Sequence, residues 1–122
     1  MKLNEYQRAA MMFAKYDTND YPFIALAEEV GEVMGKIAKF NRKNKSSMDS
    51  TINRIGSDDF QLSDRELELK KLLKKELGDV LWQLQACCNE LDFKLEDVAT
   101  ENLDKLQCRS SRGVIIGEGD DR

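Results

Sequence analysis

The chain has 122 residues, of which 34% are charged, and a formal net charge of -4 at pH 7. This length predicts one domain with a modest core, and the acidic balance gives no support for nucleic-acid binding. No apolar run approaches the roughly 20 residues of a membrane span, and no signal-peptide pattern is present, so a membrane is not an expected partner and the cytoplasm is the expected location.

Histidine is absent, which excludes Ser-His and Cys-His nucleophile pairs, His-ligated zinc and Glu-x-x-His di-iron bundles. Acid-base chemistry then depends on carboxylates, lysines, tyrosines or a metal. Cys87 and Cys88 are adjacent, which is not metal-site spacing, and Cys108 makes the total odd. We expect all three to be buried structural thiols in a reduced compartment.

Helical spacing begins at the N-terminus. The first predicted helix runs from Leu3 to about Tyr16, and residues 17–20 form a turn. The second runs from about Pro22 to Phe40 or slightly beyond, with an apolar stripe formed by Phe23, Leu26, Ala27, Val30, Met34 and Ile37.

Residues 41–63 are rich in Asn, Lys, Ser and Asp and predict a loop excursion that holds a short helical turn near 48–55. Its basic residues Arg42, Lys43 and Lys45 face either phosphates or, as the simpler alternative, solvent. Ser63 and Glu66 have the spacing of a capping box, which predicts the start of a third helix that ends near residue 91.

A fourth helix is predicted from residue 94 or 95 to Cys108. Four helices with one long loop predict an all-α, four-helix bundle-like domain over residues 1–112. Residues 113–122 lack helical character and are expected to form a mobile or ligand-dependent tail.

The most informative pattern occurs twice, as Glu29-Val-Gly-Glu32 and Glu76-Leu-Gly-Asp79. On a helix, positions i and i+3 share a face, so each copy projects two carboxylates in one direction. Two such helices packed together bring four carboxylates into one pocket, where a hard cation such as Mg²⁺ relieves their repulsion. Each glycine has a helical cost of about 1 kcal/mol, which suggests close helix approach or room for a ligand. The alternative is that all four acids lie on solvated faces.

Two further features add to this set. Glu28 supplies a fifth carboxylate four positions before Glu32. Asn102, Lys105 and Arg109 share one face of the fourth helix and suit the oxygens of a triphosphate, or else interact with the helix dipole.

Three motifs in order resemble the MazG-type, all-α nucleotide pyrophosphohydrolases: LAEEVGE at 26–32, KELGDVLW at 75–82 and NLDKLQCR at 102–109. The end of the chain, RGVIIGEGDDR at 112–122, resembles the tail of small single-domain members. The excursion between the acidic motifs is longer than is usual in that family. The likeness covers nearly the whole chain.

The resemblance implies hydrolysis of a nucleoside triphosphate, deoxy or non-canonical, to the monophosphate and pyrophosphate. It implies Mg²⁺, with Mn²⁺ as a substitute, and attack on the α-phosphorus by metal-activated water. It also implies a homodimer or homotetramer. The family's metal ligands match four carboxylates of this chain, Glu29, Glu32, Glu76 and Asp79.

The remaining residues receive roles from the same resemblance. Glu28 binds a further ion or orients water, Lys105 and Arg109 hold phosphates, and Asn102 binds the nucleotide. Trp82 lies one turn beyond Asp79 and is a candidate for contact with the base, or a core or interface tryptophan. Two other functions remain open. One is a non-catalytic helical module with an acidic docking face, and the other is cleavage of a different pyrophosphate-containing metabolite.

Overall fold

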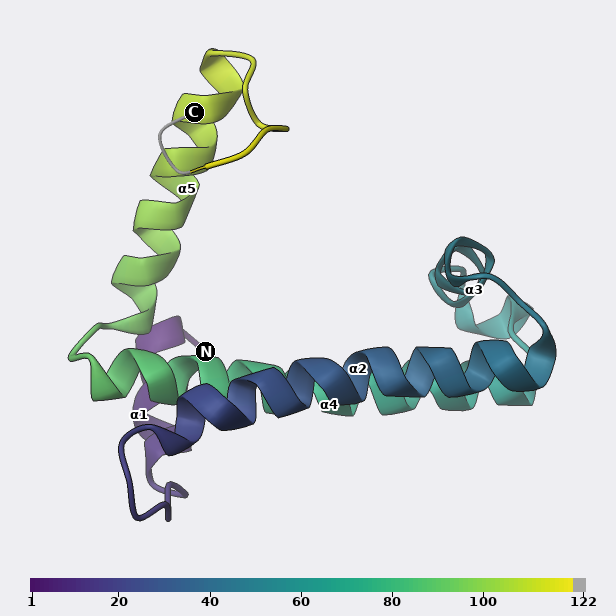
Figure 1. Cartoon of the computed structure of the whole chain (residues 1–122), viewed down its shortest axis with the longest axis horizontal. Coiled ribbons are helices and arrows are strands. Elements are labelled where there is room, and N and C mark those ends of the chain that lie inside the picture. Colours follow the sequence, from purple (N-terminus) through teal and green to yellow (C-terminus); the bar gives the residue numbers. More distant parts are fainter. Residues whose placement is uncertain (120–122) are drawn as a thin grey trace. The chain divides into compact units, whose positions relative to one another are not determined.

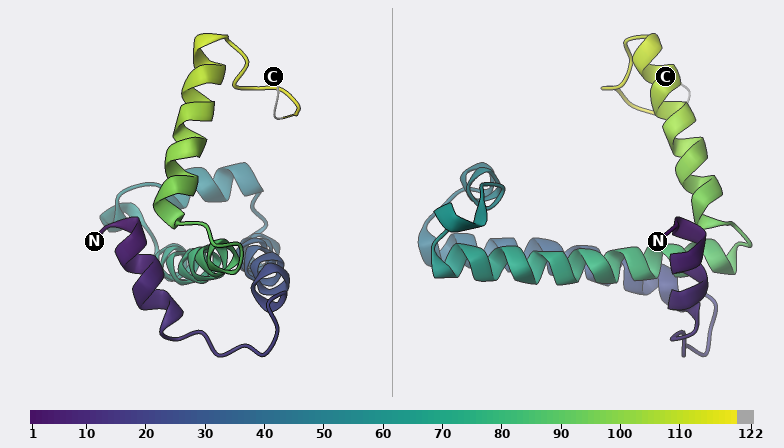
Figure 2. Two further views of the ribbon diagram at one scale, coloured as in Figure 1. Left: turned by 90° about the vertical axis from the view of Figure 1, so that its left-hand side faces the viewer. Right: turned by 180° about the vertical axis from the view of Figure 1, so that it is seen from behind.

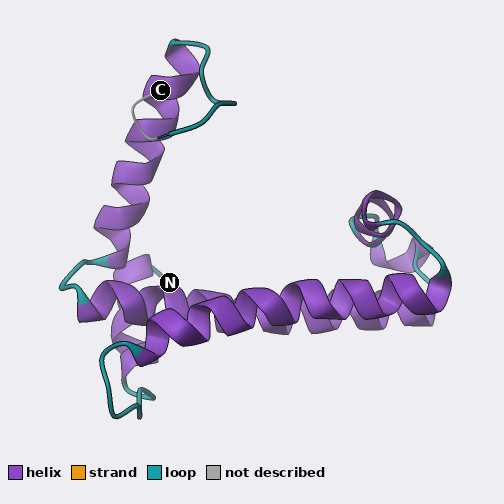
Figure 3. Cartoon of the chain, viewed as in Figure 1, coloured by secondary structure: helices purple, strands orange, loops and turns teal. Residues whose placement is uncertain are grey.

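The computed structural model describes residues 1–119, so the last three residues of the predicted tail lie outside the described part. Its elements are α1 (Leu3–Met11), α2 (Tyr21–Asn44), α3 (Met48–Ile55), the 3-10 turn η1 (Asp59–Gln61), α4 (Asp64–Glu90) and α5 (Leu95–Ser111) (Figure 1). No strand occurs within 1–119 (Figure 3). The all-α class is therefore confirmed, with five α-helices instead of the four predicted.

The chain divides into two compact units. One comprises Tyr16–Cys87, and the other comprises Met1–Lys15 with the segment from Cys88 onward. Across the described residues, no helix is both long enough and apolar enough to span a bilayer.

Helices α2 and α4 form an antiparallel hairpin whose two members lie side by side in every view (Figures 1 and 2). Helix α2 continues to Asn44, a full turn beyond Phe40, because no glycine or proline interrupts residues 36–44 and the cations Arg42 and Lys43 in its last turn suit the helix dipole. It ends at Lys45, which adopts the left-handed conformation with φ of 49°.

Much of the predicted 41–63 loop is in fact ordered structure, since it contains the end of α2, all of α3 and η1. The expected helical turn near 48–55 is a complete helix, capped by the Ser47 hydroxyl, which accepts a hydrogen bond from the Ser50 amide at 3.2 Å. The side-chain oxygen of Asn41 accepts hydrogen bonds from Ser46 and Thr51, and this joins the end of α2 to α3.

The hydrophobic core of this unit lies where α3 covers the hairpin. Ile37 of α2, Ile55 of α3 and Leu69 and Leu73 of α4 form one buried cluster, with Val33 and Phe40 packed against it. The predicted capping box then fixes the start of α4. The Ser63 amide donates to Glu66 Oε1 at 2.9 Å, and the Glu66 amide donates to Ser63 Oγ at 3.2 Å.

The apolar stripe predicted for the second helix is largely exposed. Of its six residues only Ile37 is buried, whereas Phe23, Val30 and Met34 are 43%, 49% and 50% exposed. Helix α2 instead turns Glu29 and Lys36 toward α4. On α4, the side chains of three leucines are also 38–55% exposed: Leu77, Leu81 and Leu84.

In the other unit, α1 ends at Met11 instead of continuing to Tyr16, and Phe13, two residues beyond its end, is 71% exposed. Buried Gln7 holds α1 to the start of α5. Its amide nitrogen donates to the Phe93 carbonyl at 3.0 Å, and its oxygen accepts from the Leu95 amide at 2.9 Å. Cys87 and Cys88 are buried as predicted, but Cys108 is exposed.

Candidate metal centre

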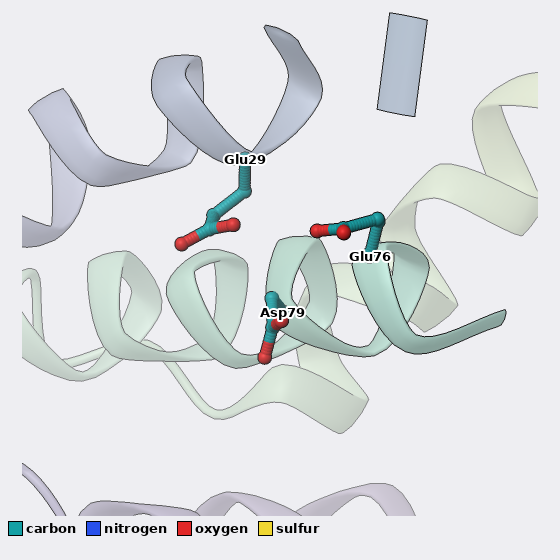
Figure 4. A group of neighbouring side chains, drawn as sticks. All are labelled: Glu29, Glu76 and Asp79. Carbon is teal, nitrogen blue, oxygen red and sulfur yellow. The ribbon is translucent and has the colours of Figure 1, made fainter. Parts of the chain in front are cut away.

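Three of the predicted carboxylates come together between α2 and α4. Glu29, Glu76 and Asp79 each offer one oxygen, and these oxygens all lie within 4.8 Å of one another. Figure 4 shows Glu29 reaching from α2 toward α4, which carries Glu76 and Asp79 one turn apart. Glu29 and Glu76 are partly buried, whereas Asp79 is exposed. Carboxylate oxygens in such a group are the donors that Mg²⁺ prefers.

The electrostatics of the group also fit a cation. The pKa of Glu29 is raised above its ordinary value, first by burial and then by the negative charges of Asp79, Glu76, Glu32 and Glu28. The carboxylates therefore repel one another, and a divalent cation at their centre would remove that repulsion. The residues present thus suit the metal that the sequence predicts.

Lys36 partly neutralises the same group. Its Nζ lies 3.4 Å from Glu76 Oε1 across the hairpin and 3.7 Å from Glu32 Oε2 on its own helix. The sequence motifs alone gave Lys36 no role. The available signal was its position seven residues after Glu29, which returns to the same helix face after two turns.

Glu32 and Glu28 lie outside the three-oxygen group. The Glu32 side chain is 59% exposed and directed to its ion pair with Lys36, and Glu28 is exposed on α2. Their charges nevertheless act on Glu29, as its raised pKa shows.

The glycines beside the acids do not serve close helix approach within the chain. A Cβ added at Gly31 or at Gly78 meets none of the described atoms within 4 Å. Both positions face open space, which leaves the second explanation, room for a ligand or another molecule.

The predicted phosphate-binding residues lie on α5, in the other unit. Asn102 and Lys105 are exposed. Arg109 is only 5% exposed, and its Nη2 donates to the Gly119 carbonyl at 3.4 Å, a burial that the sequence did not indicate. Trp82 is partly buried on α4, one turn beyond Asp79.

A helical hairpin in which Glu29 of α2 meets Glu76 and Asp79 of α4 defines an all-α protein with a carboxylate cluster suited to a metal. The family model of the MazG nucleotide pyrophosphohydrolase domain matches residues 22–114, most of the chain. The chain belongs to this family, which confirms the resemblance seen in its motifs. It is also 37% identical over 102 residues to the gene 37 protein of Mycobacterium phage L5, covering 84% of this chain and 75% of that protein. No solved structure gives a significant match to the chain.

Proposed function

We propose that the protein is a Mg²⁺-dependent nucleoside triphosphate pyrophosphohydrolase that releases pyrophosphate and a nucleoside monophosphate. The observation that carries this proposal is the meeting of the Glu29, Glu76 and Asp79 carboxylates between two helices. A divalent cation held there supplies Lewis-acid chemistry: it neutralises phosphate charge and lowers the pKa of water. Family membership supports the reaction class.

Each carboxylate has a part in this proposal. Glu29, Glu76 and Asp79 hold the cation, and Glu32 joins them by giving up its ion pair with Lys36. Glu28, one residue before Glu29, orients the attacking water. Lys36 fixes the Glu76 carboxylate through its contact across the hairpin.

Three residues on α5 have proposed roles in substrate binding. Lys105 and Arg109 steady the phosphates, and Asn102 hydrogen-bonds the nucleotide. Trp82 is the proposed candidate for contact with the base. The substrate class is a deoxy or non-canonical nucleoside triphosphate, the proposed location is the cytoplasm, and residues 113–122 are proposed to act as a tail of the 1–112 domain.

We also propose that the protein works as a homodimer or homotetramer. The exposed apolar side chains on the hairpin support this, because contiguous exposed apolar surface marks contact with another molecule. They include Val30 and Met34 on α2 and Leu77 and Leu81 on α4. Gly31 and Gly78 face open space within the same turns, which leaves room for a neighbouring backbone.

Pyrophosphate release tests the reaction. Wild type is assayed with Mg²⁺ across canonical and modified triphosphates, beside Glu76→Gln and the control Glu101→Gln, an exposed acid on α5. Removing a residue that binds the metal directly lowers activity more than removing a residue that only hydrogen-bonds to a metal ligand. We therefore expect Glu76→Gln to lower turnover by at least about 100-fold. The control is expected to match wild type.

Circular dichroism shows whether each variant stays helical. Turnover retained in folded Glu76→Gln would refute this ligand assignment. Release of no pyrophosphate from any substrate by wild type would favour the non-catalytic module with an acidic docking face. Cleavage of only another pyrophosphate-containing metabolite would revise the substrate class.

A further inference from the structure

Helices α2 and α4 line a pocket of about 620 Å³ toward the α3 end of the hairpin. Its lining includes Lys36 and Phe40 from α2 and Glu68, Leu69 and Leu72 from α4. Pockets for small molecules have volumes of about 300–1,000 Å³, with apolar walls and a few polar groups. The sequence predicted no pocket here, because its walls come from segments far apart in the chain.

The pocket continues directly from the acidic group. Lys36 lines it and also contacts Glu76 of the group at 3.4 Å. On α4, Leu72 and Leu69 precede Glu76 by four and seven residues, which places all three on one helix face. On α2, Phe40 follows Glu29 by eleven residues, or three turns, and returns to the face of Glu29.

The dimensions match the reach of a nucleotide. With a rise of about 1.5 Å per residue, Leu72 lies about 6 Å and Leu69 about 10 Å along α4 from Glu76. When a phosphate of a nucleotide lies at the acidic group, the sugar and base attached to that phosphate therefore reach this pocket.

The walls of the pocket combine an apolar surface with charged groups of both signs, which suits a nucleobase that is attached to phosphates. Phe40, Leu69 and Leu72 offer an apolar surface to a planar ring. The oxygens of Glu68 and Asp64 can accept hydrogen bonds from base amino groups. Lys39, Lys43 and Arg65 also line the pocket and would attract the phosphates of the same nucleotide.

We propose that this pocket binds the base of the nucleoside triphosphate, with Phe40 as the stacking residue. This inference rests on the proposed function, because the phosphates must lie at the acidic group. It places the base toward α3, in the opposite direction along α4 from Trp82.

Inorganic triphosphate isolates the contribution of the base, because it carries the phosphates alone. Calorimetry with Mg²⁺ measures its affinity and that of a non-hydrolysable nucleoside triphosphate for wild type and Phe40→Leu. We expect the variant to bind the nucleotide about tenfold more weakly and to bind inorganic triphosphate like wild type. In the enzymatic assay, KM rises with kcat maintained.

Phe60→Leu is the matched control, since Phe60 is 84% exposed on η1 and outside the pocket. Phe40 packs against the core, so Leu72→Asn provides a second test from the opposite helix if Phe40→Leu does not fold. Equal affinity of wild type and the folded pocket variants for the nucleotide would overturn the proposal. So would a base-dependent loss at Trp82→Leu in place of Phe40→Leu.

The outcomes separate this inference from the reaction. Pyrophosphate release that depends on Glu76 but whose KM is unaffected by Phe40→Leu and Leu72→Asn would refute the pocket and leave the function standing. Nucleotide binding that depends on Phe40, with no pyrophosphate release by wild type, would support the pocket and refute the function.

Discussion

The two halves of the α2–α4 hairpin differ in the side chains that lie between the helices. At the α3 end, Ile37, Ile55, Leu69 and Leu73 are buried together and the start of α4 is capped. In the acidic half, the space between the helices holds carboxylates, and apolar side chains such as Val30 are exposed. One half therefore holds a buried apolar cluster, and the other keeps mutually repelling charges available for a ligand.

The largest expected effect on stability tests the α3 end. Ile55 and Ile52 lie three residues apart on α3, but Ile55 is 7% exposed and Ile52 is 44% exposed. We expect Ile55→Ala to lower the free energy of unfolding by about 2–5 kcal/mol, because it removes buried methyl groups and leaves a cavity. Urea unfolding measures the change.

Ile52→Ala is the matched control, with an expected cost of less than about 1 kcal/mol. Equal losses in the two variants would show that α3 does not cover a core. Pyrophosphate release by folded Ile55→Ala, at low temperature, should still depend on Glu76, because the acidic group lies outside this cluster.

A smaller effect, on Tm, is expected from a change of pH, which acts on the carboxylate that caps α4 at the α3 end of the hairpin. The pKa of Glu66 is lowered, chiefly by the hydrogen bond that its carboxylate accepts from the Ser63 backbone amide. A lowered pKa stabilises the fold above the ordinary pKa of glutamate, and this contribution is lost as the pH falls through the lowered value. Glu66→Gln should therefore lower Tm at pH 7, with a difference from wild type that shrinks toward pH 3.

Thermal unfolding at several pH values measures this difference. Glu68→Gln is the neighbouring comparison, as an exposed acid two residues further on. A Tm difference between wild type and Glu66→Gln that is the same at pH 3 and pH 7 would show that the cap does not depend on the ionised carboxylate.

The same contrast explains what the sequence could predict. The capping box and the two acidic pairs depend on residues three positions apart on one helix, so local spacing was sufficient. The apolar stripe predicted for α2 is buried at Ile37 but exposed at Val30 and Met34, because Ile37 lies where Ile55 of α3 packs on the hairpin and the other two lie nearer the acidic group.

Features that join distant segments could not be predicted. The contact of Lys36 with Glu76 requires the register between α2 and α4, and the pocket beside Phe40 requires the same register. Gln7 is polar, and only its partners Phe93 and Leu95 explain why it is buried. The order within 41–63 also depends on long-range contacts, above all the burial of Ile55 against α4.

Binding of a divalent cation by the acidic half tests the central claim most directly. Calorimetry with Mn²⁺ and with Mg²⁺ compares wild type, Glu29→Gln and the control Glu101→Gln, each without nucleotide. We expect saturable binding to wild type and to the control, and its loss in Glu29→Gln, because the carboxylate between the helices is gone. Unchanged cation affinity in folded Glu29→Gln would contradict the account.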